Sequence, residues 1–497
     1  MSATLPLSPG RVGPFAEQRP AAVGASTGAP AGASTGAPGA STGPPGASNG
    51  AFAATRSPLA ALPGDASARL FAGPPAGAGA ESLHDHLARL GPLPLAVQRA
   101  GAEDRSALLA AIEASGLRGR GGGEFPMARK LAAASRAGGT PIVVVNAAEG
   151  EPASRKDRAL LQLRPHLVLD GAAVAAAACG AEEIVLFLRP EVLESWPVLG
   201  AEVEARRHLA PQLPIFVVAS PGSYVAGEST AVVRALEARP ALPYRHTVPV
   251  AVCGTGGQPT VVGNVETYAH LALLARFGPA WFGKAGSPQC PGSSLVTLAG
   301  DVAAPGLVAE LLAPMPGAQL LAELGGLATV PQAVLVGGYS GRWVNGAEFW
   351  AMPLDRGMLG SAGIGLGCGI VAPLGAAACG LAMTWRLLGY LAGQSAGQCS
   401  PCRFGLPALA AELDGVLAGR HGRRALVRLH RRTLSIAGQG ACGHPDGAIA
   451  LLESALSVFA DDLEGHLRGR GCGGTANGGW FPAQHAAPAA VPAAPAG

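Results

Sequence analysis

Three short apolar runs mark the first half of the chain. They lie at 141–147 (PIVVVNA), 183–189 (EIVLFLR) and 213–220 (LPIFVVAS). Short runs rich in Val, Ile and Leu predict buried strands, whereas segments such as 83–90 and 106–117 have helical patterning. Strands that alternate with helices favour an α/β layer architecture with a mostly parallel sheet.

The pattern changes near residue 285. Residues 294–312 are typical of a strand, a turn around Ala304-Pro305-Gly306 and a second strand, and 331–344 predicts a further strand. From Leu381 onward the patterning is helical. Four such segments surround a group of cysteines and predict a small helical bundle, at 382–393, 406–419, 425–438 and 448–467.

These patterns divide the chain into a tail, an α/β domain, a short β-rich module, a helical domain and a second tail, at 1–75, 80–285, 286–345, 346–472 and 473–497. The first tail repeats GASTGAP at 24–30 and 32–38. Segments composed of Gly, Ala, Ser, Thr and Pro cannot form a buried core, so both tails are predicted to be disordered.

Composition excludes several classes of protein. The net charge of the 497 residues is only +3, which gives no indication of nucleic-acid binding. Mean hydropathy is positive at +0.29, but alanine causes it, and the apolar stretch 169–188 is interrupted by acids and glycines. We therefore expect no transmembrane segment. The N-terminal residues lack the pattern of a secretory signal, which favours a cytoplasmic protein whose nine cysteines form no disulfide framework.

The block GLRGRGGGEFPMARK at 116–130 offers the chemistry of a phosphate cradle. Its clustered glycines let the backbone approach a phosphate closely and present N–H donors. Lys130 can add a positive charge. On the glycines alone, an ordinary glycine-rich loop is an equal alternative.

Two polar turns follow two of the predicted strands. Asn146, Glu149 and Glu151 come directly after the first strand, and Glu228 follows the third in GSYVAGEST at 222–230. Open α/β sheets bind ligands at the carboxyl ends of their strands. The two turns are therefore expected to converge on one crevice, where they could hydrogen-bond a ring or ribose; a solvated acidic turn is the alternative.

Cysteines suggest a second kind of site. Cys399 and Cys402 form a CxxC pair, and Cys442 follows forty residues later. Three thiolates suit an iron–sulfur cluster or zinc. Three other cysteines lie in Ala/Val-rich segments that are typical of inert, buried thiols: Cys179, Cys253 and Cys379.

Taken together, the blocks at 116–130, 146–158, 222–230, 261–267 and 398–403 resemble the family of NADH-binding, FMN-containing 51 kDa subunits of respiratory complex I. The same family occurs in NAD-linked formate dehydrogenases and hydrogenases, and the resemblance covers about 105–470, including PHL at 165–167. It implies a Rossmann-like FMN domain, a β-grasp module of the SLBB type and a C-terminal helical bundle that holds a [4Fe–4S] cluster.

The resemblance also implies roles for individual residues. It places FMN against Gly119, Arg120, Gly121, Gly122, Lys130, Asn146, Glu149, Gly227, Glu228 and Asn264. NADH would lie against Phe125, Glu151 and Tyr224, with Glu151 as the catalytic position. The cluster ligands would be Cys399, Cys402 and Cys442. Electrons would leave through the cluster to a quinone-linked or other redox partner. That partner would be a [2Fe–2S] or other redox subunit of a multisubunit complex. The chain itself would be cytoplasmic and peripheral to the inner membrane through such partners.

Several positions depart from the family pattern. Ala396 stands where the family has a cluster cysteine, so the cluster could be incomplete. Glu124 replaces a glycine and would be strained if its φ is positive. The remaining departures replace an aspartate, an asparagine, a second glutamate, a lysine and an aromatic residue, at Ala148, Gly263, Ser229, His246 and Pro249.

Three functions remain open at this point. The first is an NADH dehydrogenase-like flavoprotein subunit that oxidises NADH through FMN and an iron–sulfur cluster. The second is a divergent paralogue that keeps FMN but takes electrons from another donor, such as ferredoxin. The third is a non-catalytic scaffold that uses its β-grasp module for protein contacts. The extent of the FMN-site match favours the first.

Overall fold

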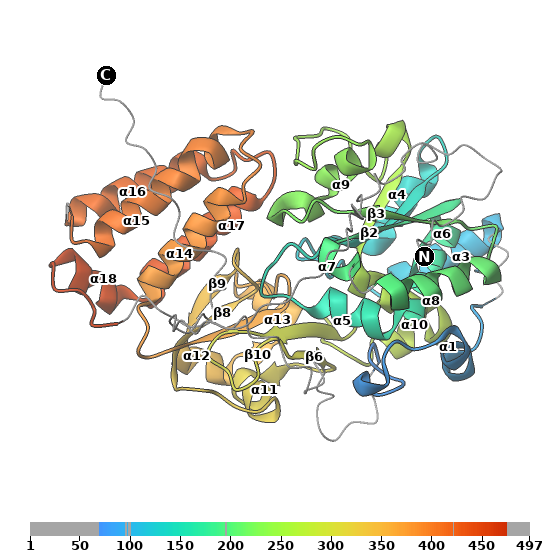
Figure 1. Cartoon of the computed structure of the whole chain (residues 1–497), viewed down its shortest axis with the longest axis horizontal. Helices are drawn as coiled ribbons and strands as arrows, with labels where there is room; N and C mark the ends of the chain where they lie inside the picture. Colours follow the sequence, from blue (N-terminus) through green and yellow to red (C-terminus); the bar gives the residue numbers. More distant parts are fainter. Residues whose placement is uncertain (1–68, 95–96, 98–100, 194–195, 421, 475–497) are drawn as a thin grey trace, which may run out of the picture. The chain divides into compact units, whose positions relative to one another are not determined.

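The computed structural model describes residues 69–94, 97, 101–193, 196–420 and 422–474, all of which belong to one compact unit (Figure 1). Most of both predicted tails lies outside the described residues. The start of the described region is packed, however. Leu70 is fully buried, and its N–H donates to Glu310 at 2.9 Å. The boundary predicted at residue 75 is therefore wrong, because one short apolar segment gives no periodic signal.

A four-stranded parallel sheet forms the centre of the first domain. Its order is β3-β2-β1-β4, with β1 at Ile142–Ala147, β2 at Glu183–Leu188, β3 at Ile215–Ala219 and β4 at Thr260–Asn264. The isoleucine and the valines of β1 are all buried because helices cover both faces of the sheet, as continuous apolar runs require. The predicted α/β class and parallel sheet are confirmed.

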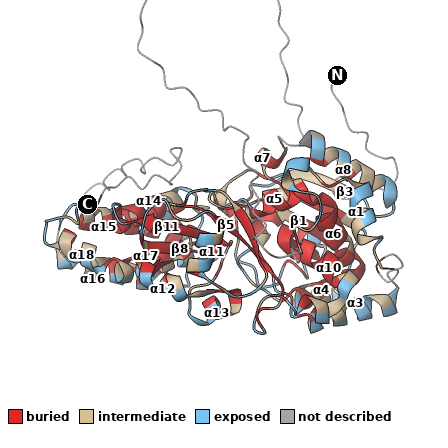
Figure 2. Cartoon of the chain, turned by 90° about the horizontal axis from the view of Figure 1, so that it is seen from below, coloured by how far each residue is buried: buried red, intermediate tan, exposed pale blue. Residues whose placement is uncertain are grey.

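Helices surround this sheet, and Figure 2 shows the buried residues gathered around β1, α5, α6 and α10. They are η1 (Ala76–Ala78), α1 (Leu83–Leu90), α3 (Ala102–Ala114), α4 (Met127–Arg136), α5 (Lys156–Leu163), α6 (Pro165–Cys179), α7 (Pro190–Leu193), α8 (Trp196–Leu209), η2 (Tyr224–Gly227), α9 (Ser229–Leu236), η3 (Thr255–Gly257) and α10 (Val265–Phe282). Helices α6 and α10 pack directly against each other and against β1. A Cβ at Gly171 would lie 1.6 Å from the Tyr268 carbonyl oxygen, so this crossing requires glycine.

A second, five-stranded mixed sheet follows. Its order is β6-β5-β11-β8-β9, with β5 at Ser294–Leu298, β6 at Val308–Leu311, β8 at Pro331–Val336, β9 at Arg342–Asn345 and β11 at Ile370–Gly375. Strand β11 lies between β5, to which it is parallel, and β8, to which it is antiparallel. The sheet therefore extends beyond the boundary predicted at residue 345. Around it are β7 (Met315–Pro316), α11 (Gly317–Glu323), α12 (Gly346–Ala351), β10 (Pro353–Leu354) and α13 (Arg356–Ser361).

Alternating side chains of β8 serve two different cores. Ala333 and Leu335 pack with the helical domain, whereas Val334 and Val336 pack with the side of the sheet that holds α11 and α12. This is the period-two alternation of a strand with both faces covered. One sheet thus joins the β-rich module to the helices that carry the predicted cluster cysteines.

The C-terminal part is a helical bundle, as predicted. It comprises α14 (Gly380–Gly393), a π-helical turn η4 (Pro401–Gly405), α15 (Leu406–Leu417), α16 (Arg423–Ile436), α17 (His444–Val458) and α18 (Ala460–Leu467). The last predicted segment is divided into α17 and α18 at Phe459. No helix in the described part of the chain is long and apolar enough to cross a membrane.

Candidate functional site: a glycine-lined cavity beside the cysteine bundle

The ends of three strands meet at one place. Asn146 and Asn264 are paired in register at the carboxyl ends of the neighbouring strands β1 and β4. The Asn146 side-chain amide also donates to the Gly227 carbonyl oxygen at 2.7 Å, in the turn that follows β3. A Cβ at Gly227 would lie 2.8 Å from the Ala148 carbonyl oxygen, so glycine allows the turns to touch. The predicted convergence of the two turns is confirmed.

The glycine-rich loop lies beside this convergence. A Cβ at Gly121 would be 3.2 Å from Cβ of Asn264, and Gly122 has a φ of +96°. Gly119 closes the loop by donating its N–H to the Phe125 carbonyl oxygen at 2.9 Å. The Phe125 ring is about half exposed at 51%. The loop therefore presents bare backbone and one accessible aromatic ring next to the strand ends.

Lys130 is a partly buried cation with no carboxylate partner among the described residues. Its ammonium donates to the Val262 carbonyl oxygen at 2.8 Å, and no carboxylate pairs with it in the described part of the chain. Burial lowers the pKa of this lysine below its ordinary value. A partly buried ammonium that spends one donor on a carbonyl oxygen fits a bound phosphate or another electron-rich group of FMN, which would replace the hydration that it has lost.

Two of the predicted FMN residues are already bonded within the protein. Glu149 accepts the backbone N–H of Asp157 at 3.1 Å and that of Arg158 at 3.2 Å, at the start of α5. Glu228 is the N-cap of α9 and accepts the N–H of Thr230 at 2.8 Å. These carboxylates fix the turns around the site. Direct contact with FMN stays a prediction for both.

Arg120 and Asn264 are also held by protein groups. The Arg120 guanidinium is buried and donates to the Pro291 carbonyl oxygen at 2.7 Å. The Asn264 amide donates to Asp157, and its oxygen accepts from Lys156 at 3.1 Å. These contacts fix the orientation of both side chains, and their roles in binding FMN stay predictions.

The site opens into a cavity of about 420 Å³. It is lined by Gly122, Glu124, Glu151, Tyr224, Gly337, Ser340, Gly341, Ile364, Gly365, Gly367, Cys368, Gly443 and Gly447. The lining residues from Gly337 onward are not among the site residues predicted from the sequence. The sequence GGYSG at 337–341 could have indicated the first of them, because it is a glycine-rich turn that directly follows strand β8.

Glu151 is the buried carboxylate of this cavity, with 5% of its surface exposed. It accepts the Tyr339 N–H at 2.9 Å and the Tyr224 hydroxyl at 3.3 Å. A Cβ at Gly338 would lie only 2.7 Å from its Oε2, so glycine makes room for the carboxyl group. Burial raises the pKa of Glu151 to about 7, although these donors oppose the shift.

This raised pKa predicts a pH-dependent stability. The folded chain holds a proton on Glu151 more tightly than the unfolded chain does, so stability should fall as the pH rises from about 4.5 to about 7. A shift from 4.5 to about 7 corresponds to about 3 kcal/mol. We expect Glu151→Gln to remove that part of the slope. Urea unfolding of both proteins at several pH values measures it; parallel pH profiles would contradict the assignment.

Glu124 has the positive φ that its replacement of glycine suggested. Its φ is +45°, and its carboxylate pairs with the buried Arg356 guanidinium at 3.0 Å. Arg356 also donates to the Gly367 carbonyl oxygen at 3.1 Å, while its Nη2 has no partner within the described residues. The strained glutamate thus neutralises a cation at the rim of the cavity.

The other departures have distinct placements. Gly263 is required by packing, since its Cβ would lie 2.7 Å from the buried Tyr268 ring. Ala148 donates its N–H to the Asn146 side chain at 3.2 Å. Ser229 begins α9, and His246 and Pro249 are exposed.

The three predicted cluster cysteines lie close together in the bundle. Cys399 interacts directly with Cys402, which lies on the π-helical turn, and both interact electrostatically with Cys442. Burial raises the pKa of Cys402 to about 12. It also pushes the pKa of Cys399 upward, but hydrogen bonds from Ala441 and Cys402 hold it below its ordinary value. Three neighbouring thiols suit a cluster, and Ala396 supplies no fourth.

Tyr224 connects the cavity with the bundle. Its hydroxyl faces Glu151, its backbone N–H donates to Gln394 at 3.2 Å, and its ring contacts the ring of His444 at 5.4 Å between centroids. His444 comes two residues after Cys442. The cavity and the cysteine site are therefore separated by little more than one aromatic side chain.

Comparison with known proteins agrees with this geometry. Residues 112–273 match the Nuo51 FMN-binding domain, and residues 382–466 match the NADH-ubiquinone oxidoreductase-F iron–sulfur binding region. The F subunit of NADH-quinone oxidoreductase from Streptomyces coelicolor is 34% identical over 382 residues, which cover 73% of this chain and 84% of that protein. The chain belongs to the family of NADH-quinone oxidoreductase F subunits.

Other members of this family are similarly distant. The second of two such proteins from Rhizobium meliloti is 32% identical, over 73% of this chain and 89% of its own. Among solved structures, the NAD⁺-reducing [NiFe]-hydrogenase in its air-oxidised state matches with a TM-score of 0.69 and 29% identity, over 78% of this chain and 67% of that chain. The cavity residues from Gly122 to Tyr224 thus lie in the part of the chain that matches an FMN-binding domain, and the three cysteines lie in the part that matches a [4Fe–4S] binding region.

Proposed function

We propose that this chain is an electron-transfer subunit that takes electrons from NADH through FMN and passes them to an iron–sulfur cluster at Cys399, Cys402 and Cys442. One observation supports this most strongly. Tyr224 touches both the cavity carboxylate Glu151 and the bundle residue His444. A site built only for binding would not require a cysteine cluster packed against its wall.

The chain's own residues would bind and orient the cofactor. FMN, when bound, supplies the chemistry that accepts a hydride and releases electrons singly. The Lys130 ammonium would neutralise an electron-rich group of FMN, and the loop at Gly119, Gly121 and Gly122 would let the backbone approach it. The partly buried Lys130 ammonium and the exposed glycine backbone of the loop fit such a ligand.

Glu151 would hold a proton near the reacting ring. Its pKa near 7 lets it change charge in the physiological range, and the Tyr339 N–H and the Tyr224 hydroxyl fix its orientation. We propose that this carboxyl group sets the charge beside the nicotinamide. The half-exposed Phe125 ring offers a surface on which an aromatic base can stack.

A second candidate is a paralogue that keeps FMN but uses another electron donor. Glu124 supports it, because its carboxylate lines the cavity and neutralises Arg356. A dinucleotide carries phosphates that would be repelled by Glu124 and attracted by a free Arg356. The two candidates differ in whether NADH reaches the flavin at all.

Variants at Glu124 separate these candidates. We expect NADH to reduce the flavin of the wild-type protein anaerobically, and Glu124→Gly to lower the NADH concentration for half reduction about tenfold, through lost repulsion and a freed Arg356. Glu124→Gln keeps the size of the side chain without its charge, so its NADH concentration for half reduction should lie between those of the wild type and Glu124→Gly. Flavin absorbance under NADH measures this. Unchanged absorbance in all three proteins, with reduction by reduced ferredoxin, would favour the second candidate.

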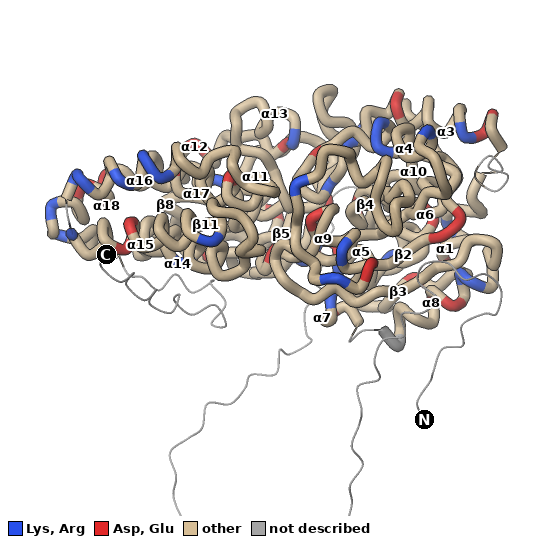
Figure 3. Tube along the Cα trace, turned by 90° about the horizontal axis from the view of Figure 1, so that it is seen from above, with Lys and Arg blue, Asp and Glu red and all other residues tan. Residues whose placement is uncertain are grey.

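The partner would be an acidic redox protein, such as a [2Fe–2S] subunit. Helix α16 carries five arginines, at 423, 424, 428, 431 and 432, and Figure 3 shows this basic run along the bundle. Helix α16 packs against the π-helical turn that holds Cys402. A negative partner docked there would lie near the cluster, which favours rapid association and short electron transfer.

A further inference from the structure

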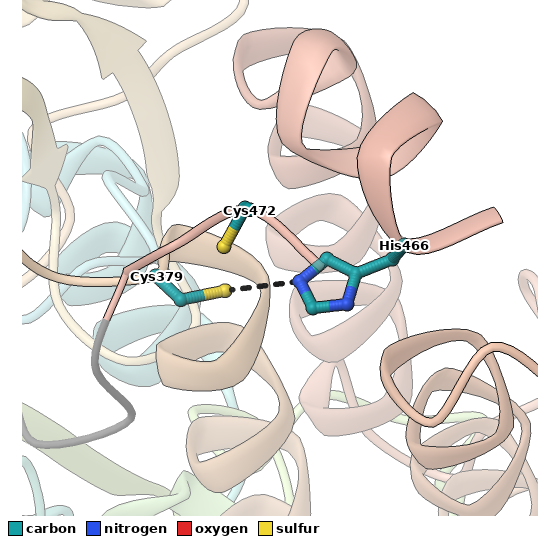
Figure 4. A group of neighbouring side chains, drawn as sticks. All are labelled: Cys379, His466 and Cys472. Carbon is teal, nitrogen blue, oxygen red and sulfur yellow. Dashed lines mark hydrogen bonds between the residues drawn. The ribbon is translucent and has the colours of Figure 1, made fainter. Parts of the chain in front are cut away.

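A second group of metal-binding side chains lies at the other end of the bundle. Cys379, His466 and Cys472 come from three places: the residue before α14, the last turns of α18 and the segment after α18. Figure 4 shows their side chains pointing toward one another. One potential ligand atom from each lies within 4.8 Å of the other two. Cys379, expected from its Ala-rich surroundings to be an inert buried thiol, instead lies beside two other potential metal ligands.

Cys379 and His466 have the spacing of two ligands in a tetrahedral metal site. The Cys379 sulfur is 3.6 Å from Nε2 of His466. Zinc bonds of about 2.3 Å to sulfur and about 2.0–2.1 Å to nitrogen, at a tetrahedral angle, place these two ligands about 3.6 Å apart. The two atoms therefore need no rearrangement to share one ion.

His466 is oriented for coordination through Nε2. Its Nδ1 lies 3.0 Å from the Leu417 carbonyl oxygen. A carbonyl oxygen can only accept, so Nδ1 carries the proton and the lone pair of Nε2 faces Cys379. Metal-bound histidines commonly donate their second N–H to such an acceptor, which fixes both tautomer and ring orientation. His466 is 9% exposed, so few waters compete for that lone pair.

Cys379 is held in place at the start of α14. It is the N-cap of α14, and its sulfur accepts the N–H of Ala382 at 3.3 Å. The amino end of a helix stabilises negative charge. Asp462, one turn before His466 on α18, interacts electrostatically with both Cys379 and His466 and adds negative potential for a cation.

Glycines bring Cys472 to the other two ligands. A Cβ at Gly465 would lie 2.4 Å from the Gly471 carbonyl oxygen, and one at Gly474 would lie 2.8 Å from the Cys379 nitrogen. The chain after α18 thus folds back tightly onto the start of α14. This close approach depends on the two glycines, because a side chain at either position would push the segment away from α14.

We propose that Cys379, His466 and Cys472 bind a zinc ion, with a fourth position open to water, and that this ion ties the segment after α18 to the start of α14. The site is separate from the iron–sulfur cysteines. Helix α14 lies between Cys379 and the loop that leads to Cys399, and its 14 residues span about 21 Å. These residues therefore cannot supply the ligand that Ala396 lacks.

Metal analysis of the full-length protein tests this proposal. We expect about one zinc per chain besides the iron, and loss of that zinc in Cys379→Ser/Cys472→Ser while the iron content stays unchanged. Cys253→Ser, which removes an exposed cysteine, is the matched control and should keep both metals. If the double variant fails to fold, the single variant Cys472→Ser should show the same zinc loss.

Cobalt exchange gives a readout independent of folding. Wild-type protein loaded with cobalt should show the visible bands of a tetrahedral ion and a thiolate charge-transfer band, and His466→Ala should weaken both. Zinc that persists in the double cysteine variant would overturn the proposal. So would a disulfide between Cys379 and Cys472, detected by mass spectrometry of the non-reduced protein.

Discussion

Lys130→Ala is expected to yield a protein that has lost its flavin. The Lys130 ammonium is partly buried, and it donates to a carbonyl oxygen rather than to a carboxylate. Removing one member of a buried charge pair between this ammonium and a bound flavin should weaken binding by about 3 kcal/mol or more, which is more than about a hundredfold. Flavin content after gel filtration, measured by absorbance and by fluorescence of released FMN, gives the result.

Stability separates a binding role for Lys130 from a structural one. Without flavin, the charged Lys130 ammonium destabilises the folded protein, because it has lost hydration, as its lowered pKa indicates. The flavin-free Lys130→Ala protein should therefore unfold at no lower urea concentration than the flavin-free wild type. Lys284→Ala removes an exposed lysine and should keep the flavin. Full flavin content in Lys130→Ala would contradict the proposal that Lys130 helps to bind FMN.

Ala396→Cys is expected to strengthen the iron–sulfur site. A cysteine there would complete a regular spacing with Cys399 and Cys402, and Cys442 would be the fourth ligand. Residue 396 is partly exposed in the loop after α14, next to Gly397 with its φ of +64°, so a thiol can be accommodated. Four thiolates hold a cubane at every iron, whereas three leave one iron open to loss.

Iron retention under a chelator measures this effect. We expect the wild type to fall from about four to about three iron atoms per chain, and Ala396→Cys to keep about four. Ala396→Ser is the matched control, because it has a similar size without a thiolate, and it should behave as the wild type does. Equal retention in all three proteins would mean that another group already serves as the fourth ligand.

The local chemistry of the FMN site followed from the sequence because it depends on short segments. The runs at 141–147, 183–189 and 213–220 contain β1, β2 and β3, and the polar residues after them lie at the strand ends as parallel sheets require. The fourth strand, β4, was not predicted as a strand. It is only five residues long and ends in Gly263 and Asn264, which weaken the apolar signal.

The β-rich module shows where pattern alone fails. The predicted strand at 331–344 is a hairpin of β8 and β9, whose turn GGYSG also lines the cavity. Strand β11 escaped notice because it contains Pro373 and is separated from its partners by more than thirty residues. Its pairing is set by tertiary contacts, and a helical boundary placed at 346 could not anticipate it.

Long-range contacts also decide the parts of the site that the sequence could not predict. Tyr224 was assigned to the nucleotide site, but its contacts with Gln394 and His444 depend on how the bundle packs on the first domain. Likewise, Cys379 and Cys472 are almost a hundred residues apart in the sequence. Only the packing of α18 on α14 brings His466 close to both of them. No short motif encodes such a group.

An anaerobic titration with NADH, followed by both absorption and electron paramagnetic resonance, tests the central claim most directly. If the cavity and the cysteine site form one electron path, NADH will bleach the flavin bands and produce the signal of a reduced iron–sulfur cluster. The claim is contradicted if NADH leaves both centres oxidised while dithionite reduces them.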